Sequence, residues 1–186
     1  MDLVKVVEEV LLMPPRCGNT HVLAIDGRAG AGKTTLANNL LLALSVTYPV
    51  SLIHMDEMYE GWDCALGESL TGRLSNLLGD LSHGVAHQLP TYDWSAKAFN
   101  SYREIPPTHI LILEGVGSAQ RIVREFATAT IWLDIDSETG LARVLERDGK
   151  VSEPFMSQWQ VDEDTHHRRE KTRENADFVL STVQLL

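Results

Sequence analysis

Cysteine is scarce in this sequence of 186 residues, which contains only Cys17 and Cys64. The two residues form neither a C-x-x-C pair nor the spacing of a metal-ligand set. Two free thiols are typical of a protein in a reducing compartment. We therefore expect neither a disulfide framework nor a cysteine-based metal site.

Long apolar runs are also missing, since none approaches the roughly 20 residues that a membrane-spanning helix needs. The first residues are Met1-Asp2-Leu3-Val4-Lys5, with Glu8 and Glu9 soon after. They lack the basic start and the apolar core of a signal peptide. We expect a cytoplasmic protein with no membrane partner.

Basic residues are few: 16 lysines and arginines stand against 26 aspartates and glutamates, for a formal net charge of -10. Nucleic-acid backbones bind clustered Lys and Arg, so we expect no nucleic-acid partner. A phosphate ligand is still compatible with this charge, because a few focused basic side chains create a local positive cleft.

The apolar pattern is typical of one α/β domain spanning residues 1–186. Short apolar segments predict five strands, at 21–26, 50–55, 109–113, 129–134 and 177–180. Helical periodicity occurs at 2–13, 33–46, 69–82, 118–126, 137–147 and 154–173. This alternation predicts a parallel sheet covered on both faces. The stretch 83–107, which contains three prolines, is expected to be an irregular functional loop.

A glycine-rich turn lies between the first predicted strand and the next helix. Its sequence, Gly27-Arg28-Ala29-Gly30-Ala31-Gly32-Lys33-Thr34, satisfies the P-loop pattern G-x-x-x-x-G-K-[ST] in full. Successive N–H groups of such a loop, together with the helix N-terminus, face phosphate oxygens. We expect these residues and Thr35 to bind the phosphates of ATP, with Lys33 at the β- and γ-phosphates and Thr34 on Mg²⁺.

Two other classes of P-loop protein carry signatures that do not occur here. A switch GTPase has an N-K-x-D motif, and a transporter-type ATPase has L-S-G-G-Q; the sequence contains neither. Instead, His54-Met55-Asp56-Glu57-Met58-Tyr59 follows the second predicted strand. Asp56 therefore falls at the carboxyl end of a strand, the edge where open α/β sheets bind ligands.

At this point the sequence resembles the uridine kinase branch of the P-loop nucleoside and nucleotide kinases, over about residues 20–182. The resemblance implies a P-loop NTPase kinase fold, with a five-stranded parallel sheet flanked by helices, and ATP-dependent phosphorylation of a nucleoside. The segments that carry it besides the P-loop are Asp56–Tyr59 (D-x-F-Y, with Met58 for Phe), Tyr92-Asp93 with a later Arg103, Ile112–Val116 (a strand ending in E-G), Arg147-Asp148 in the lid, and Ala176–Leu180.

Carboxylates supply the candidate acid–base and metal chemistry. Asp56 is the candidate general base for the acceptor hydroxyl, and an N-cap is its alternative role. Glu57 is a second carboxylate, either near magnesium or facing solvent. Glu114 is either part of a magnesium site with Thr34 and Asp56 or a buried acid satisfied by Lys33.

Aromatic residues flank the irregular segments and predict an acceptor pocket, because their faces can stack on a base or a sugar. Each one alone is more typical of a protein core; the set favours a pocket. The candidates are Tyr59, Trp62, Tyr92, Asp93 and Trp94, together with Arg103.

Arg143 and Arg147 lie four residues apart, on one face of a predicted helix. We expect them to close over the ATP phosphates within a lid at about 143–157. The alternative is a surface ion pair with Glu146 or Asp148.

The last predicted helix also carries charged residues. Arg168, Arg169 and Arg173 have the same two possible roles, and Arg173 is the most site-like of them. The adjacent His166 and His167 lie among charged residues and are expected to face solvent.

These residues predict an ATP-dependent phosphotransferase for a small hydroxyl acceptor, with a nucleoside as the first candidate. A kinase for a nucleoside monophosphate or another small molecule, and a nucleotide-binding regulator without turnover, are the alternatives. Between Leu52 and Trp94 the only basic side chain besides histidine is Arg73. Because a phosphorylated acceptor requires matching cations, we expect a neutral or only modestly charged acceptor. The sequence leaves open whether the protein forms a homo-oligomer.

Overall fold

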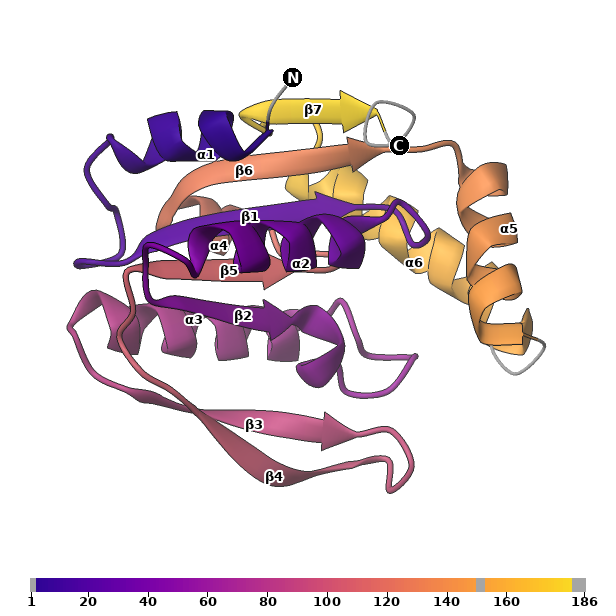
Figure 1. Ribbon diagram of the computed structural model, residues 1–186. Coiled ribbons are helices and arrows are strands. Elements are labelled where there is room, and N and C mark those ends of the chain that lie inside the picture. Colours follow the sequence, from indigo (N-terminus) through magenta and orange to yellow (C-terminus); the bar gives the residue numbers. More distant parts are fainter. Residues whose placement is uncertain (1–2, 150–152, 182–186) are drawn as a thin grey trace.

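The protein is described by a computed structural model that covers residues 3–149 and 153–181 (Figure 1). Its centre is a five-stranded sheet in the order β2-β5-β1-β6-β7, in which all neighbouring strands are parallel. The predicted parallel sheet is therefore confirmed. Its strands are β1 (His21–Gly27), β2 (Val50–His54), β5 (Ile110–Glu114), β6 (Ala127–Asp134) and β7 (Phe178–Ser181).

Helices cover both faces of this sheet (Figure 1). One face packs against α1 (Leu3–Leu11) and α2 (Lys33–Leu44), and the other against α3 (Glu68–Ser82), α4 (Arg121–Arg124) and α6 (Glu153–Glu170). Helix α5 (Ser137–Asp148) follows β6 at the carboxyl end of the sheet. Among the described residues, no helix is long and apolar enough to span a membrane.

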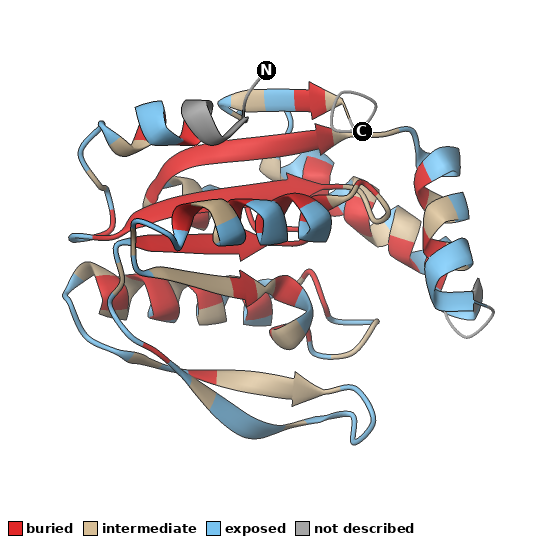
Figure 2. Cartoon of the chain, viewed as in Figure 1, coloured by how far each residue is buried: buried red, intermediate tan, exposed pale blue. Residues whose placement is uncertain are grey.

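The strands are buried on both sides, which explains why their sequences read as continuous apolar runs. Successive side chains of a strand point to opposite faces. In β1, Val22 and Ala24 join the core under α3, whereas Leu23 and Ile25 join the core under α2. Figure 2 shows β1, β5 and β6 buried along almost their whole length.

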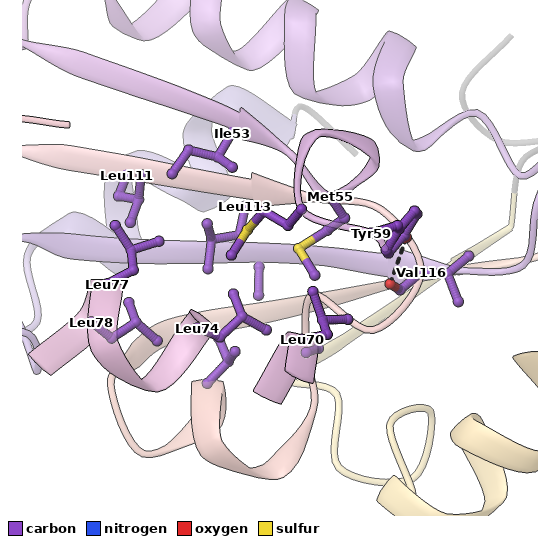
Figure 3. Packing of buried hydrophobic residues seen from close by; sticks show 14 of the residues in the cluster. Ile53, Met55, Tyr59, Leu70, Leu74, Leu77, Leu78, Leu111, Leu113 and Val116 are labelled. Carbon is purple, nitrogen blue, oxygen red and sulfur yellow. Dashed lines mark hydrogen bonds between the residues drawn. The ribbon is translucent and has the colours of Figure 1, made fainter. Parts of the chain in front are cut away.

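Helix α3 contributes one leucine stripe to the larger core. The buried leucines recur at helical spacing and pack against Ile53, Leu111 and Leu113 of the sheet (Figure 3). They are Leu70, Leu74, Leu77, Leu78 and Leu81. Truncating one of them to alanine would destabilise the fold by about 2–5 kcal/mol.

The stretch 83–107 is a β-hairpin, so the prediction of an irregular loop is wrong. β3 (His87–Asp93) and β4 (Ala98–Ile105) pair antiparallel in a sheet of their own. Pro90 lies inside β3, opposite Tyr102. Proline is tolerated in a strand that has a free edge, and its presence obscured the strand pattern in the sequence. The hairpin lies beside β2 (Figure 1).

Two predicted helices end differently in the structure. The helix expected at 118–126 is reduced to α4, because Gly117 and Ala119 donate their backbone N–H groups to the Asp26 carboxylate in a turn. The helix expected at 154–173 ends at Glu170, where Lys171 follows with a φ of 53°. Of the predicted segments, Asp2 and residues 150–152 of the lid lie outside the described residues.

Candidate active site

A cavity of about 500 Å³ opens at the carboxyl ends of β1, β2 and β5. This is the edge where parallel sheets place their ligand-binding residues. Its walls come from the P-loop, the turn after β2, the end of β5, the hairpin turn, α5 and α6. The lining residues are Ala29, Gly30, Gly32, Lys33, Thr34, Thr35, Asp56, Tyr59, Trp62, Trp94, Glu114, Gly115, Val116, Arg143, Val144, Arg147, Asp148, Met156 and Trp159.

The P-loop forms one end of this cavity and has the strained backbone that its glycines permit. Gly30 and Gly32 have φ angles of 77° and 89°, which side chains rarely allow. The ammonium of Lys33 is held in the loop by the carbonyl oxygens of Gly27 and Arg28, at 2.8 Å each. Burial lowers the pKa of Lys33, while the surrounding carboxylates oppose that shift.

The P-loop also touches the first turn of α5 through backbone atoms. A Cβ added to Gly30 would lie 2.2 Å from the carbonyl oxygen of Gly140, and one added to Gly140 would lie 2.7 Å from that of Ala29. Both distances are shorter than any real carbon–oxygen contact. Glycine at these two positions therefore lets the P-loop and α5 meet directly.

Three P-loop residues do not line the cavity. Gly27 ends β1 and Ala31 is buried. Arg28 turns away and pairs with Glu163 and Asp164 of α6. In this conformation the Arg28 side chain therefore does not lie where it could bind a phosphate in the cavity.

Thr34 and Glu114 supply oxygen ligands beside the P-loop. The Thr34 hydroxyl donates to the Glu114 carboxylate at 3.1 Å, and His54 also binds that carboxylate through Nδ1. Lys33 donates to backbone oxygens rather than to Glu114. Carboxylate and hydroxyl oxygens suit Mg²⁺, which usually keeps several waters and substrate phosphate oxygens as further ligands. Among the described residues, no cluster of three or more His, Cys, Asp or Glu forms a metal cage by itself.

Asp56 faces the cavity from the short 3₁₀ turn Met55–Glu57 that follows β2. Its side chain is exposed, and the surface that it exposes lines the cavity. The enclosing protein atoms and the negative charge of Glu114 raise the pKa of Asp56. The residue lies inside the turn rather than at its N-cap, which is His54.

Aromatic side chains form the wall opposite the P-loop, which we call the aromatic wall. Its members Tyr59, Trp62 and Trp94 were expected from the sequence, and Trp159 was not. The Trp62 ring lies 5.3 Å from that of Trp94 and 5.6 Å from that of Trp159. Met156 and Val116 complete the wall.

Three predicted acceptor residues lie outside the cavity lining. Asp93 is partly exposed and accepts hydrogen bonds from the backbone N–H groups of Ser95 and Ala96, so it shapes the hairpin turn. Tyr92 packs edge-on against Trp94. Arg103 pairs with Glu57 and donates to the Leu52 carbonyl, which ties the hairpin to β2. These residues support the aromatic wall instead of contacting its cavity.

The sequence profile of the Phosphoribulokinase / Uridine kinase family matches residues 69–183, more than half of the chain. The chain belongs to this family of P-loop kinases. A uridine kinase from Staphylococcus haemolyticus is 26% identical over 182 residues, covering 87% of each chain. A uridine kinase from Staphylococcus aureus (strain Newman) is 27% identical over 145 residues, covering 70% of each.

Two solved structures have the same fold as this chain. A possible uridine kinase from Bacillus stearothermophilus superposes with a TM-score of 0.69 at 23% identity, covering 97% of this chain and all of that one. A putative fructose transport system kinase from Silicibacter sp. TM1040 gives a TM-score of 0.68 at 21% identity, with 97% and 99% coverage. At these identities the likeness establishes the P-loop kinase fold.

In this member of the Phosphoribulokinase / Uridine kinase family, α5 brings Arg143 and Arg147 to the cavity. Arg147 also pairs with Asp148, so the ion pair and the cavity position occur together. Hydrogen bonding to Asp148 raises the pKa of Arg147. Arg173, which the sequence marked as site-like, lies elsewhere and pairs with Asp134.

The prediction that His166 and His167 face solvent is wrong, because α6 buries both rings. His167 lies 3.4 Å from the carboxylate of Asp26, the residue that precedes the P-loop, and its ring packs edge-on against Trp132. Burial lowers the pKa of His166. His167 therefore packs against the end of β1, and His166 lies against Gly117 in the turn after β5.

The inward face of α6 also carries residues that sequence reasoning missed. Met156, Trp159, Glu163 and His166–His167 recur at helical spacing and are all buried. The periodicity itself was the available signal. It was overlooked because the polar members of the stripe break a purely hydrophobic pattern.

Proposed function

We propose that this protein is an ATP-dependent kinase that phosphorylates a hydroxyl group of a nucleoside-like acceptor, with Mg²⁺ as cofactor. One observation carries the proposal: the carboxylate of Asp56 faces the same cavity as Lys33, Thr34 and the aromatic wall. A phosphate-binding end, a base and a surface for a flat ring thus border one space. The family of the chain and the uridine kinases among its relatives support this assignment.

The P-loop end would bind the triphosphate. Its N–H groups and the N-terminus of α2 favour negative charge, and Lys33 adds a fixed cation. Arg143 and Arg147 face the same space from α5 and would neutralise charge that develops on the transferred phosphoryl group. Thr34 and Glu114 would hold Mg²⁺, which supplies charge neutralisation at the phosphates; Asp56 is a further ligand only if it is not the base.

Asp56 would act as the general base. An ionised carboxylate accepts the proton of the acceptor hydroxyl as that oxygen attacks the γ-phosphorus. The raised pKa makes this carboxylate a better proton acceptor than an ordinary aspartate. It titrates closer to neutral pH than an ordinary aspartate, which suits proton transfer there.

A neutral acceptor fits the distribution of charge. Among the described residues that line the cavity, the cations are Lys33, Arg143 and Arg147, and all three belong to the P-loop or to α5. Arg73 pairs with Glu60 outside the cavity. A second phosphate on the acceptor would therefore meet Asp56 and Glu114 without a cation of its own.

The test is acceptor-dependent ADP release, measured for each common nucleoside and for its 5′-monophosphate. We expect higher kcat/KM for nucleosides. A preference for the monophosphates would reassign the protein as a nucleotide kinase, and ATP binding without acceptor-dependent ADP release would identify a regulatory binder.

We also propose a cytoplasmic location, which the two free cysteines support.

A further inference from the structure

The polar atoms of the aromatic wall are mostly engaged within the protein. Three of its four rings donate their O–H or N–H group to a neighbouring oxygen, so they offer apolar faces and edges to the cavity. The pairs are Tyr59 with the Val116 carbonyl (2.8 Å; Figure 3), Trp94 with the Asp56 carbonyl (3.0 Å) and Trp159 with the Glu163 carboxylate (3.2 Å).

Trp62 differs from the other three rings. Its indole N–H donates to no group in the described part of the chain. Its ring is stacked on Phe155 at 5.2 Å, with the planes only 5° apart. Trp62 therefore has a fixed ring and a single available donor.

Amide, imidazole and serine side chains, which commonly read the edge of a base, are missing from the described lining of the cavity, and its two threonines, Thr34 and Thr35, belong to the P-loop end. Among its described lining residues there is no Asn, Gln, Ser or His. The carboxylates Asp56 and Glu114 lie beside the P-loop, and both oxygens of Asp148 bind Arg147. The one hydroxyl of the aromatic wall, that of Tyr59, is buried and donates to the Val116 carbonyl.

Resting on the proposed nucleoside acceptor, we propose that the aromatic wall selects a planar, conjugated ring by its face, with Trp62 as its one side-chain donor, and does not recognise a ring N–H. Base–aromatic stacking is strong and tolerates different edges. A ring N–H placed against this wall would lose its hydrogen bond to water and gain none from the protein. Methylation of that nitrogen would therefore remove no interaction with the protein.

Three acceptors separate the two kinds of recognition: uridine, N3-methyluridine and 5,6-dihydrouridine. N3-methyluridine lacks the ring N–H but keeps the conjugated face, whereas dihydrouridine keeps the N–H and loses planarity. We expect N3-methyluridine to stay within about threefold of uridine in kcat/KM and dihydrouridine to fall about tenfold or more. The opposite order would overturn the inference while leaving the kinase assignment intact. If uridine itself is not phosphorylated, the nucleoside assignment fails and the inference fails with it.

Substitutions at Trp62 locate the effect. Trp62→Phe keeps a ring and removes the donor, while Trp62→Ala removes both. We expect the KM for uridine to rise only a few-fold in the first and about tenfold or more in the second, with the KM for ATP unchanged. Tyr102→Ala, an exposed aromatic of β4 outside the cavity, is the matched control. Equal effects of the two Trp62 substitutions, or none from Trp62→Ala, would overturn recognition by the ring face.

Discussion

Glu163 and Trp159 are joined by a hydrogen bond on the inward face of α6, from the indole Nε1 to Oε2 at 3.2 Å. The same carboxylate oxygen accepts the backbone N–H of Ala29 in the P-loop at 3.0 Å. Glu163 is only 1% exposed, so both bonds are shielded from water. One buried carboxylate thus connects the phosphate loop to the aromatic wall.

Glu163→Gln should raise the KM for both ATP and acceptor, on the order of 2- to 10-fold each. Glutamine has one acceptor oxygen and loses the charge that pairs with Arg28. Steady-state kinetics with each substrate varied in turn would measure the effect. Asp164→Asn is the control, because Asp164 also pairs with Arg28 but is more exposed. A fall in Tm with both KM values unchanged would show that Glu163 only stabilises the fold.

Lys33→Ala should reduce turnover about 100-fold or more, because it removes a cation from the site of phosphoryl transfer. The fold should persist, since α2 and β1 keep their packed cores. Single-turnover ADP formation and thermal melting would report the two effects separately. Lys97→Ala, in the exposed hairpin turn, should behave like the wild type. Normal turnover without Lys33 would rule out the P-loop mechanism.

Asp56→Asn should lower kcat about 10²–10⁴-fold, the usual effect of losing a general base. ATP affinity should change little, because the residue serves the acceptor. Glu57→Gln is the control, since Glu57 pairs with Arg103 instead of lining the cavity. If ATP binding collapses while turnover per bound ATP survives, Asp56 is a metal ligand and another group is the base.

The pH dependence of kcat/KM should also reveal Asp56. Loss of hydration within the cavity walls, followed by the charge of Glu114, raises its pKa above the ordinary 3.8. Only the ionised carboxylate accepts a proton, so activity should fall as the pH drops through that raised pKa. The acid limb should therefore lie above that of a typical aspartate, and it should disappear in Asp56→Asn. An acid limb at the pKa of an ordinary aspartate would contradict the assignment of Asp56 as the base.

The buried His166 should make stability depend on pH. Burial lowers its pKa below 6.5, so between the two values the unfolded chain binds a proton that the folded chain does not. This contribution to stability is complete above about pH 6.5 and is lost as the pH falls toward the lowered pKa. We expect His166→Leu to flatten Tm against pH in that window, and the exposed His83→Leu to leave the slope unchanged. Identical slopes in both variants would exclude His166 as the cause.

The fold could be read from the sequence because its signals are local. A buried strand, the P-loop and an amphipathic helix each have their own pattern, and together they predict the parallel sheet and its ligand-binding edge. The hairpin β3–β4 escaped because Pro90 and a mostly exposed β4 conceal the alternation of a strand.

The candidate site was harder to predict because part of it is assembled by tertiary contacts. Lys33, Thr34, Asp56 and Glu114 follow from motifs and strand ends, and the structure brings them to one cavity. Trp159 comes from α6, more than sixty residues beyond Trp94, and no local pattern indicates that the two rings border the same space. Asp93 is the opposite case: it matches a motif in the sequence, but its side chain stabilises the hairpin turn instead of lining the cavity.

The backbone contact between Gly30 and Gly140 fixes α5, and with it Arg143 and Arg147, against the P-loop. Arg143 and Arg147 follow Gly140 by about one and two helical turns. The backbone contact at Gly140 therefore sets their distance from the P-loop. No side chain lies in that gap to be repacked by changes elsewhere in the core. We expect a methyl group at either glycine to push α5 away from the P-loop and so to move both guanidinium groups together. The distance between these guanidinium groups and the P-loop is thereby set by two missing side chains, 110 positions apart in the sequence.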